Sequence, residues 1–283
     1  MSPSAVADSI KNLEEILGTQ LFNRHRTGVE LTIDGYRFLD SAKSILRQLN
    51  DSIFAFQNET MNVEGEFVIG ASFSVMGYYL PTPLSQFEKV YPNLKVGLAE
   101  HTRKDLEQLL LAGEIDIAFM ITSNIGISQG VKVKTLFRSK RTLWCSERHR
   151  FAEMNQVSMA DIAKEKYIML VADEAEENID QIWKRYGRVP DIKVRTQSVE
   201  AVRSFISREH GVAILSDLLF RPWSLDGTQI VSIPIEEPIP TMNLGIVWDS
   251  GKNQSRGEKL FVEFLISDAK QHRELSDLRD TEI

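Results

Sequence analysis

Hydroxyl side chains stand at three places where a predicted strand gives way to a predicted helix: Ser72 with Ser74, Thr102, and Ser198. Each can accept a hydrogen bond from a free amide in the first turn of its helix, and Thr102 with Asp105 has the form of a capping box. In parallel α/β sheets, ligands bind at the carboxyl ends of strands, where free amides favour anions. These hydroxyls therefore either only cap their helices or also line a cleft for a small polar or carboxylate ligand. No cationic anchor for such a ligand can be assigned.

Other chemistry has little support in the sequence. The five histidines are scattered, and no pair has metal-ligand spacing, so we expect no metal site. His101, beside Thr102, is the one histidine expected near the cleft. Glycine-rich phosphate loops and the Gly-x-Ser-x-Gly elbow are missing from the sequence. Cys145 sits in a strand-like run, which indicates a buried apolar residue more than a nucleophile. We expect neither an enzyme nor a cofactor.

The composition suits an ordinary water-soluble protein of about two domains. The chain has 283 residues, of which 42% are hydrophobic and 26% charged. A single cysteine suits a reducing, cytoplasmic location, and no apolar run approaches the ~18 residues of a membrane span. The net charge of −7 excludes a protein that coats nucleic acid by charge alone. It leaves room for a small DNA-reading module.

The first residues predict a helix followed by a hairpin. Ser2 and Pro3 form an N-cap and first-turn pair, and helically spaced apolar residues continue until Gly18. A basic stretch at 23–27 and a short alternating strand at 29–32 follow. This layout is typical of a winged helix-turn-helix.

A second helix is predicted from Gly35 to Asn58, with a coiled-coil seam. The seam consists of Phe38, Ala42, Ile45, Leu49, Ile53 and Phe56. At ~1.5 Å per residue the helix is about 36 Å long, too long to hide its seam against a small winged domain. It either packs on its own domain or pairs with a partner helix, and we favour dimerisation.

From about residue 63, strands and helices alternate, which predicts a largely parallel sheet with helices on its faces. Predicted strands lie at 67–70, 96–98, 115–121, 142–145, 167–170, 212–215 and 242–248, and predicted helices lie near 80–90, 102–111, 178–185, 199–209 and 258–267. We expect the last strand and helix to return to the first unit, so that two lobes are joined by crossovers. The charged tail from Gln271 is expected to fray.

Three segments together resemble the LysR-type transcriptional regulators. The first combines Ser2 to Val6, Ile10, Leu13-Glu14, Leu17-Gly18, Leu21-Phe22, Arg24 and Leu31-Thr32; the others are Leu106 to Ala118 and Gly211 to Leu215. The resemblance covers Ser2 to about Ser267. It implies an α/β chain with a partial winged helix-turn-helix, a linker helix and a two-lobed effector domain like periplasmic binding proteins of type 2. The implied parts are 1–34 (recognition helix and wing), 35–62 (linker and dimerisation), 63–270 (effector domain, with lobe I at about 63–139 and 242–268 and lobe II at about 140–241) and 271–283 (tail).

The resemblance also assigns site residues. Those facing DNA are Ser2, Pro3, Ser4, Ala5, Ser9, Arg24 and Arg26, and those facing the effector are Ser72, Ser74, Thr102, Thr122 and Ser198. The implied partners are promoter DNA, a small polar or carboxylate effector, and further copies of the chain in a homodimer or homotetramer.

Some features depart from the family pattern. The chain begins at the recognition helix, so Val6, Ile10 and Leu13 lack the preceding helix against which they would pack. Ala7-Asp8 stands where the family commonly has a serine followed by a polar or basic residue, and an aspartate that faces phosphates would weaken binding. Residues 1–58 carry six Lys or Arg against seven Asp or Glu. The leading hypothesis is a cytoplasmic, effector-responsive, N-terminally shortened transcriptional regulator. The alternative is a small-molecule-binding module that has lost DNA binding.

Overall fold

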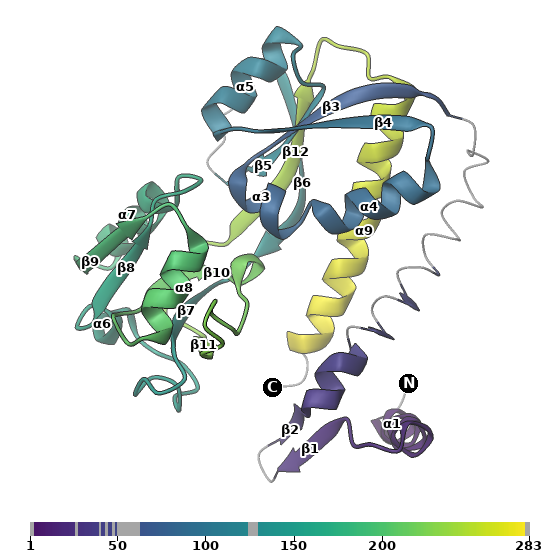
Figure 1. The fold of residues 1–283 in the computed structure, drawn as a ribbon. Coiled ribbons are helices and arrows are strands. Elements are labelled where there is room, and N and C mark those ends of the chain that lie inside the picture. The colour runs from purple at the N-terminus through teal and green to yellow at the C-terminus, as the bar shows by residue number, and fades with distance from the viewer. Residues whose placement is uncertain are drawn as a thin grey trace. The chain divides into compact units, whose positions relative to one another are not determined.

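The computed structural model describes residues 3–25, 28–39, 41–42, 45–46, 49, 63–123 and 130–280. The chain forms two compact units, Met1–Met61 and Asn62–Ile283, and each is described by itself. Figure 1 shows the elements of both. Within the described residues, none of the helices combines the length and apolar character needed to cross a lipid bilayer.

The first unit contains the predicted helix and hairpin. Helix α1 (Pro3–Leu17) ends at Gly18, whose φ of 67° is left-handed and suits glycine. Strands β1 (Phe22–His25) and β2 (Gly28–Leu31) pair antiparallel. Residues 33–39 are helical, so the second helix begins two residues earlier than Gly35.

Polar side chains of the first unit fix the connections between its elements. The Glu14 carboxylate accepts the Leu21 amide at 2.7 Å. The Thr32 hydroxyl donates to the Gln20 carbonyl at 2.7 Å and accepts the Gly35 amide at 2.9 Å. A Cβ at Gly35 would lie 2.1 Å from the Leu21 carbonyl oxygen, so only glycine fits there. These contacts give a physical reason for several residues of the first segment that resembles the LysR-type regulators.

The predicted seam of the second helix is only partly described. Ile45 and Leu49 are 63% and 55% exposed, whereas Phe38 and Ala42 are half-buried. The seam residues Ile53 and Phe56 lie outside the described residues.

Lobe I of the second unit is built on a five-stranded sheet of order β4-β3-β5-β12-β6. The strands are β3 (Gly65–Ala71), β4 (Leu94–Glu100), β5 (Ile117–Ile121), β6 (Val131–Ser139) and β12 (Met242–Asp249). Strand β3 pairs parallel with β4 and β5, but β12 runs antiparallel to both β5 and β6. Strand β6 therefore runs in the same direction as β3, β4 and β5, and the prediction of a largely parallel sheet holds for lobe I with β12 as the exception. The chain leaves this sheet along β6 and returns along β12, so the two strands must point in opposite directions.

Helices cover the two faces of this sheet (Figure 1). They are α3 (Phe73–Tyr78), α4 (Pro81–Val90), α5 (Arg103–Ala112) and α9 (Arg256–Asp280). Leu106 of α5 and Ile115 pack so closely on β3 that a Cβ at Gly70 would lie 2.5 Å from each. Phe67 lies on the opposite face of β3, with its ring 5.7 Å from that of Phe261 in α9.

Helix α9 is longer than predicted. It continues to Asp280, where we expected a helix ending at Ser267 and a frayed tail from Gln271. Residues 271–280 contain neither glycine nor proline and are rich in good helix formers, which accounts for the continuation.

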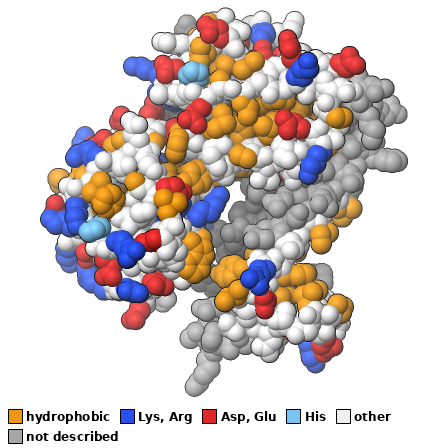
Figure 2. Space-filling model, in the orientation of Figure 1, with side chains coloured by type: hydrophobic (Ala, Val, Ile, Leu, Met, Phe, Trp, Pro, Cys, Tyr) orange, Lys and Arg blue, Asp and Glu red, His pale blue; other side chains and the backbone are white. Residues whose placement is uncertain are grey.

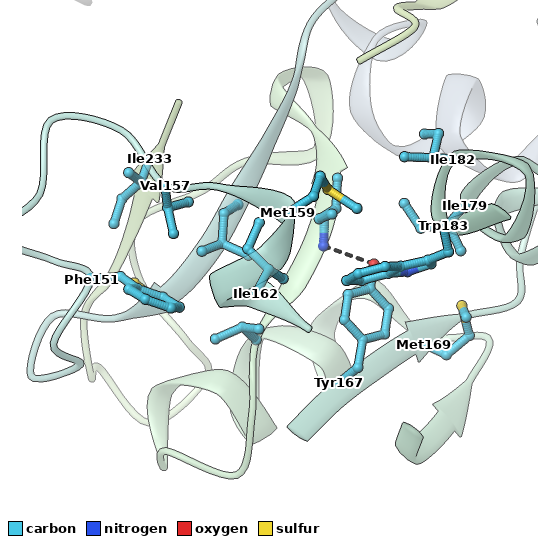
Figure 3. Close-up of a cluster of buried hydrophobic side chains, with 14 residues drawn as sticks. Phe151, Val157, Met159, Ile162, Tyr167, Met169, Ile179, Ile182, Trp183 and Ile233 are labelled. Carbon is cyan, nitrogen blue, oxygen red and sulfur yellow. Dashed lines mark hydrogen bonds between the residues drawn. The ribbon is translucent and has the colours of Figure 1, made fainter. Parts of the chain in front are cut away.

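Lobe II contains a three-stranded antiparallel sheet of order β10-β7-β11 and a parallel β8-β9 pair. Its elements are β7 (Arg141–Ser146), α6 (Met159–Ile162), β8 (Lys166–Leu170), α7 (Ala175–Arg185), β9 (Asp191–Thr196), α8 (Val199–Ser207), β10 (Ala213–Ser216), the 3₁₀ turn η1 (Asp217–Leu219) and β11 (Ile230–Ile233). The prediction of a largely parallel sheet is wrong for the antiparallel β10-β7-β11 sheet. The core of lobe II gathers aromatic and aliphatic side chains around Tyr167 and Trp183, whose rings meet edge to face at 5.5 Å (Figure 3). The Ile214 amide donates to the Tyr167 hydroxyl at 2.9 Å, which ties β10 to β8.

Candidate functional site

A cavity of about 30 Å³ lies between the two lobes and is the candidate ligand site. Lobe I contributes residues of α3, β5 and β12, and lobe II contributes residues around β7, β8, α7, β10 and η1. Apolar side chains make up most of the lining. Its polar members are Ser74, Arg141, Asp173, Asn178 and Ser216. We call this space the inter-lobe cavity.

Ser74 and Asp173 join the lobes across the inter-lobe cavity. Ser74 follows β3 and is 2% exposed, and its backbone amide donates to Asp173 Oδ2 at 2.6 Å. Asp173 follows β8 in the other lobe and has a φ of 50°. An amide that donates to a carboxylate is the interaction by which proteins hold small anions. Here the carboxylate belongs to the protein itself.

Arg141 places a positive charge on the same cavity. It opens β7 opposite Ser216 of β10, and its guanidinium donates to the Pro240 carbonyl. Burial lowers the pKa of Arg141 below its usual value, but a guanidinium stays protonated at neutral pH. The sequence assigned no cationic anchor, because the β7–β10 pairing that brings Arg141 to the cavity is a tertiary feature.

A second charged contact joins the lobes next to Asp173. Arg103 of α5 contacts Glu174 Oε1 at 2.7 Å and also pairs with Glu107 at 2.6 Å. The hydrogen bond to Glu174 raises the pKa of Arg103. Asn178 in turn donates to the Glu174 carbonyl at 2.7 Å. Residues 173 and 174 therefore reach lobe I through two adjacent carboxylates.

The five predicted effector residues are all described, and Ser74 is the one that lines the cavity. Ser72 is the buried N-cap of α3, and its hydroxyl has no hydrogen-bond partner within the described part of the chain. Thr122 is half-buried and packs its hydroxyl 3.4 Å from the Asn243 carbonyl. Thr102 and Ser198 are exposed and cap α5 and α8, as the first of the two interpretations requires.

Four polar residues of the cavity lining were not predicted from the sequence: Arg141, Asp173, Asn178 and Ser216. Asp173 and Ser216 each follow a predicted strand, at 167–170 and 212–215. The rule that ligands gather at the carboxyl ends of strands could have found both, had it been applied to every polar residue and not only to helix-capping hydroxyls.

The predicted DNA-facing residues fall on α1 and β1. Ser4, Ala5 and Ser9 are exposed on α1, and the Ser9 hydroxyl donates to the Ala5 carbonyl at 2.9 Å. Pro3 opens α1 and Arg24 belongs to β1, but their side chains are not described; Ser2 and Arg26 lie outside the described residues.

Cys145 is not among the residues that line the inter-lobe cavity. Cys145 is buried in β7, and burial raises the pKa of its thiol from 9.0 to about 12, which makes it a poor nucleophile. Among the residues that the structure describes, no group of His, Cys, Asp and Glu is placed to hold a metal ion. On the face shown in Figure 2, basic and acidic side chains are interspersed.

Comparisons with known proteins agree for both units. Residues 62–270 match the family model of the LysR substrate-binding domain, and residues 1–36 match that of the bacterial regulatory helix-turn-helix protein of the LysR family. The chain is 26% identical over 267 residues to the transcriptional dual regulator GltC of Bacillus subtilis, which covers 93% of this chain and 87% of GltC.

Solved structures show the same fold. A putative LysR family regulator from Pseudomonas aeruginosa superposes with a TM-score of 0.69 at 24% identity, covering 95% of this chain and 90% of that chain. The effector-binding domain of BenM with its effector benzoate superposes with a TM-score of 0.65 at 18% identity, covering 75% of this chain and 95% of that chain. The family-model matches to both units show that this chain belongs to the LysR family of transcriptional regulators, with a helix-turn-helix unit and a two-lobed effector-binding domain.

Proposed function

We propose that this regulator binds a small carboxylate-bearing metabolite in the inter-lobe cavity and that binding changes how it engages promoter DNA. The observation that carries the proposal is that a basic residue, Arg141, and a residue whose amide already binds a carboxylate, Ser74, line one cavity bounded by both lobes. A cation and an amide together suit a carboxylate. A ligand that touches both lobes favours one relative position of the lobes, which is how binding can be transmitted.

Helix α1 is the element proposed to read DNA. Residues 4–9 are all exposed, so the first turns of α1 are open to a major groove. The residues proposed to contact DNA are Ser2, Pro3, Ser4, Ala5, Ser9, Arg24 and Arg26. We assign base contacts to the start of α1 and phosphate contacts to the two arginines.

The second helix is proposed to hold two copies of the chain together. Ile45 and Leu49 are 63% and 55% exposed although they belong to the predicted apolar seam. Covering such a seam with a partner helix removes it from water and places two α1 helices on paired half-sites. The proposed assembly is a homodimer, and sedimentation of the full chain distinguishes it from a homotetramer. Action on promoter DNA places the protein in the bacterial cytoplasm.

Selection from a random DNA library tests the DNA half of the proposal. The full chain is expected to enrich a two-fold symmetric sequence and to shift that sequence in a gel at low salt, more strongly than a scrambled duplex. Enrichment of nothing, or equal binding to the scrambled duplex, would contradict it.

A ligand screen tests the effector half. Small carboxylates such as benzoate and shikimate, each beside its neutral amide, are scored by the rise they cause in the unfolding temperature. We expect at least one carboxylate to stabilise the chain and to change its affinity for the selected DNA, while the matched amide does neither. If no ligand alters DNA affinity, the cavity does not control DNA binding.

A further inference from the structure

We propose that Asp173 is a built-in carboxylate that occupies the anion-binding position of the inter-lobe cavity, so that an acidic ligand must displace it. This inference rests on the proposed function of the cavity and names its means of control. It makes Asp173 a competitor of the ligand and a determinant of which ligands bind.

The contacts of Asp173 are those that a bound carboxylate would make. Its Oδ2 atom accepts the amide of Ser74 at 2.6 Å, and Ser74 is 2% exposed. Asp173 shares the cavity lining with Arg141. One amide hydrogen cannot serve two carboxylates well, so a ligand carboxylate can reach Ser74 only after Asp173 has left.

The backbone around Asp173 shows that these contacts hold the segment in place. Asp173 and Glu174 have φ values of 50° and 60°, and among the described residues Glu209 is the one other non-glycine residue with a positive φ. A left-handed conformation at two successive residues is unfavourable and persists only where surrounding contacts compensate for it. Here both side chains contact lobe I, Asp173 at Ser74 and Glu174 at Arg103.

The size of the inter-lobe cavity also indicates that a ligand must displace Asp173. Pockets that hold small ligands enclose about 300–1,000 Å³, whereas this cavity measures about 30 Å³. A metabolite therefore enters only when the lobes separate, which breaks the Ser74–Asp173 and Arg103–Glu174 contacts. The Asp173 carboxylate then becomes hydrated, and the ligand carboxylate takes its place between the Ser74 amide and Arg141. The free energy for opening must come from the difference in ligand affinity between the two forms.

Removal of the charge of Asp173 tests this competition. Asp173→Asn keeps the size of the side chain and a residue type that tolerates positive φ, but makes it a weaker acceptor. Glu176→Gln is the matched control, because Glu176 lies in α7, just after Asp173, yet pairs with Arg195 inside lobe II. The probes are benzoate and its neutral analogue benzamide, titrated calorimetrically into the full chain.

The expected result is a benzoate affinity at least tenfold higher for Asp173→Asn than for the unchanged chain, with Glu176→Gln within twofold of it. Benzamide should not show this gain. Equal benzoate affinities, or no benzoate binding by either chain, would overturn the proposal. Neither outcome touches the proposed function, which fails only if no ligand of the screen alters DNA affinity.

A distance measurement distinguishes competition between Asp173 and the ligand from a purely structural role of Asp173. Glu88 and Lys184 are exposed on α4 and α7, one in each lobe, and spin labels on Glu88→Cys and Lys184→Cys report the separation of the lobes. The native Cys145 is buried and does not interfere. Benzoate should lengthen the label distance in the unchanged chain, and Asp173→Asn should lengthen it without benzoate. A distance that neither change moves would show that Asp173 does not control opening.

Discussion

At the scale of the residue, Arg141 is the side chain on which anion binding in the inter-lobe cavity should depend most. Arg141→Gln removes the charge and leaves a polar side chain of moderate length. Because a hydrogen bond to a charged group contributes about 1.5–3 kcal/mol, carboxylate affinity should fall by roughly 10- to 100-fold. Calorimetric titration with the best carboxylate of the ligand screen measures the change.

Arg138→Gln supplies the matched control for this prediction. Arg138 is exposed on β6 and is not part of the cavity lining, yet its loss changes the net charge equally. If both variants lose the same affinity, the effect comes from the general field of the protein and Arg141 is not the anchor.

Cys145 gives a pH dependence whose sign follows from its burial. Burial raises the pKa of the Cys145 thiol from 9.0 to about 12 in the folded chain. Above pH 9 the unfolded chain releases this proton while the folded chain keeps it, so the free energy of unfolding falls as pH rises. Between pH 9 and 12 this loss of stability should approach about 1.4 kcal/mol for each pH unit. Below pH 9 the stabilising contribution of Cys145 is fully present.

Urea unfolding at pH 8 and at pH 10.5 measures this contribution. Cys145→Ala is expected to lose less stability between the two pH values than the unchanged chain, whatever its absolute stability. A thiol reagent at pH 8 should label the folded chain at least 100-fold more slowly than the unfolded chain. Equal pH slopes for the two chains would show that the thiol titrates normally.

At the scale of the element, two glycines show how different constraints end a helix and start a strand. Gly113 ends α5 with a φ of 74°, and nothing lies within 4 Å of the position of a Cβ. Gly211 precedes β10 with a φ of 156°, and a Cβ there would lie 2.4 Å from the Lys166 carbonyl oxygen. Gly113 is therefore required only for its backbone angles. Gly211 is required for its backbone angles and also because there is no space for a Cβ.

Alanine at each position should therefore have a different effect on stability. Gly113→Ala should lower the free energy of unfolding by about 1–2 kcal/mol, the strain of a left-handed residue. Gly211→Ala should lower the free energy of unfolding by ~1–3 kcal/mol more than Gly113→Ala does, because β8 and β10 must move apart. Urea unfolding of both variants measures the difference, and similar losses would mean that the backbone at Lys166 yields easily.

The strands also show which parts of the fold could be predicted from the sequence. Strand β5 could be predicted because its five residues are all apolar, and the structure buries all five. Strands β6 and β9 were missed because charged residues alternate along them, at Lys132 and Lys134 and at Lys193 and Arg195. Half-exposed strands of this kind acquire their identity from the sheet they join, which local patterns do not reveal.

The residues of the candidate site also differ in whether the sequence could predict them. Ser74 could be predicted because it opens the helix that follows a buried strand. Arg141 precedes its strand, and only its pairing opposite Ser216 brings it to the cavity. Asp173 contacts a residue 99 positions away in the other lobe. Contacts between lobes depend on how the lobes close, and no spacing along the chain encodes that.

At the scale of the whole molecule, charge does not explain DNA binding. The net charge is −7, so the acidic body opposes a polyanion at long range. Affinity must come from specific contacts, and presenting two copies of α1 on one duplex multiplies them. A second binding event within one complex proceeds at an effective concentration of about millimolar. Dimerisation should therefore matter more for this regulator than for a basic one.

Breaking the seam of the second helix tests that dependence. Ile45→Asp and Leu49→Asp each place a charge on an exposed seam position, and Ser41→Asp places the same charge on an exposed position outside the seam. The seam variants should sediment as monomers at 10 µM, and their affinity for the selected symmetric DNA should fall at least ~100-fold, as expected when a second linked contact is lost.

Affinity for a single half-site separates dimer loss from damage to α1. It should stay within threefold for all three variants, because α1 and the hairpin are unchanged. Ser41→Asp should remain dimeric and bind the symmetric DNA as the unchanged chain does. Seam variants that remain dimeric would move the dimer contact to another part of the molecule, whereas monomers that keep full affinity would show that one copy of α1 suffices.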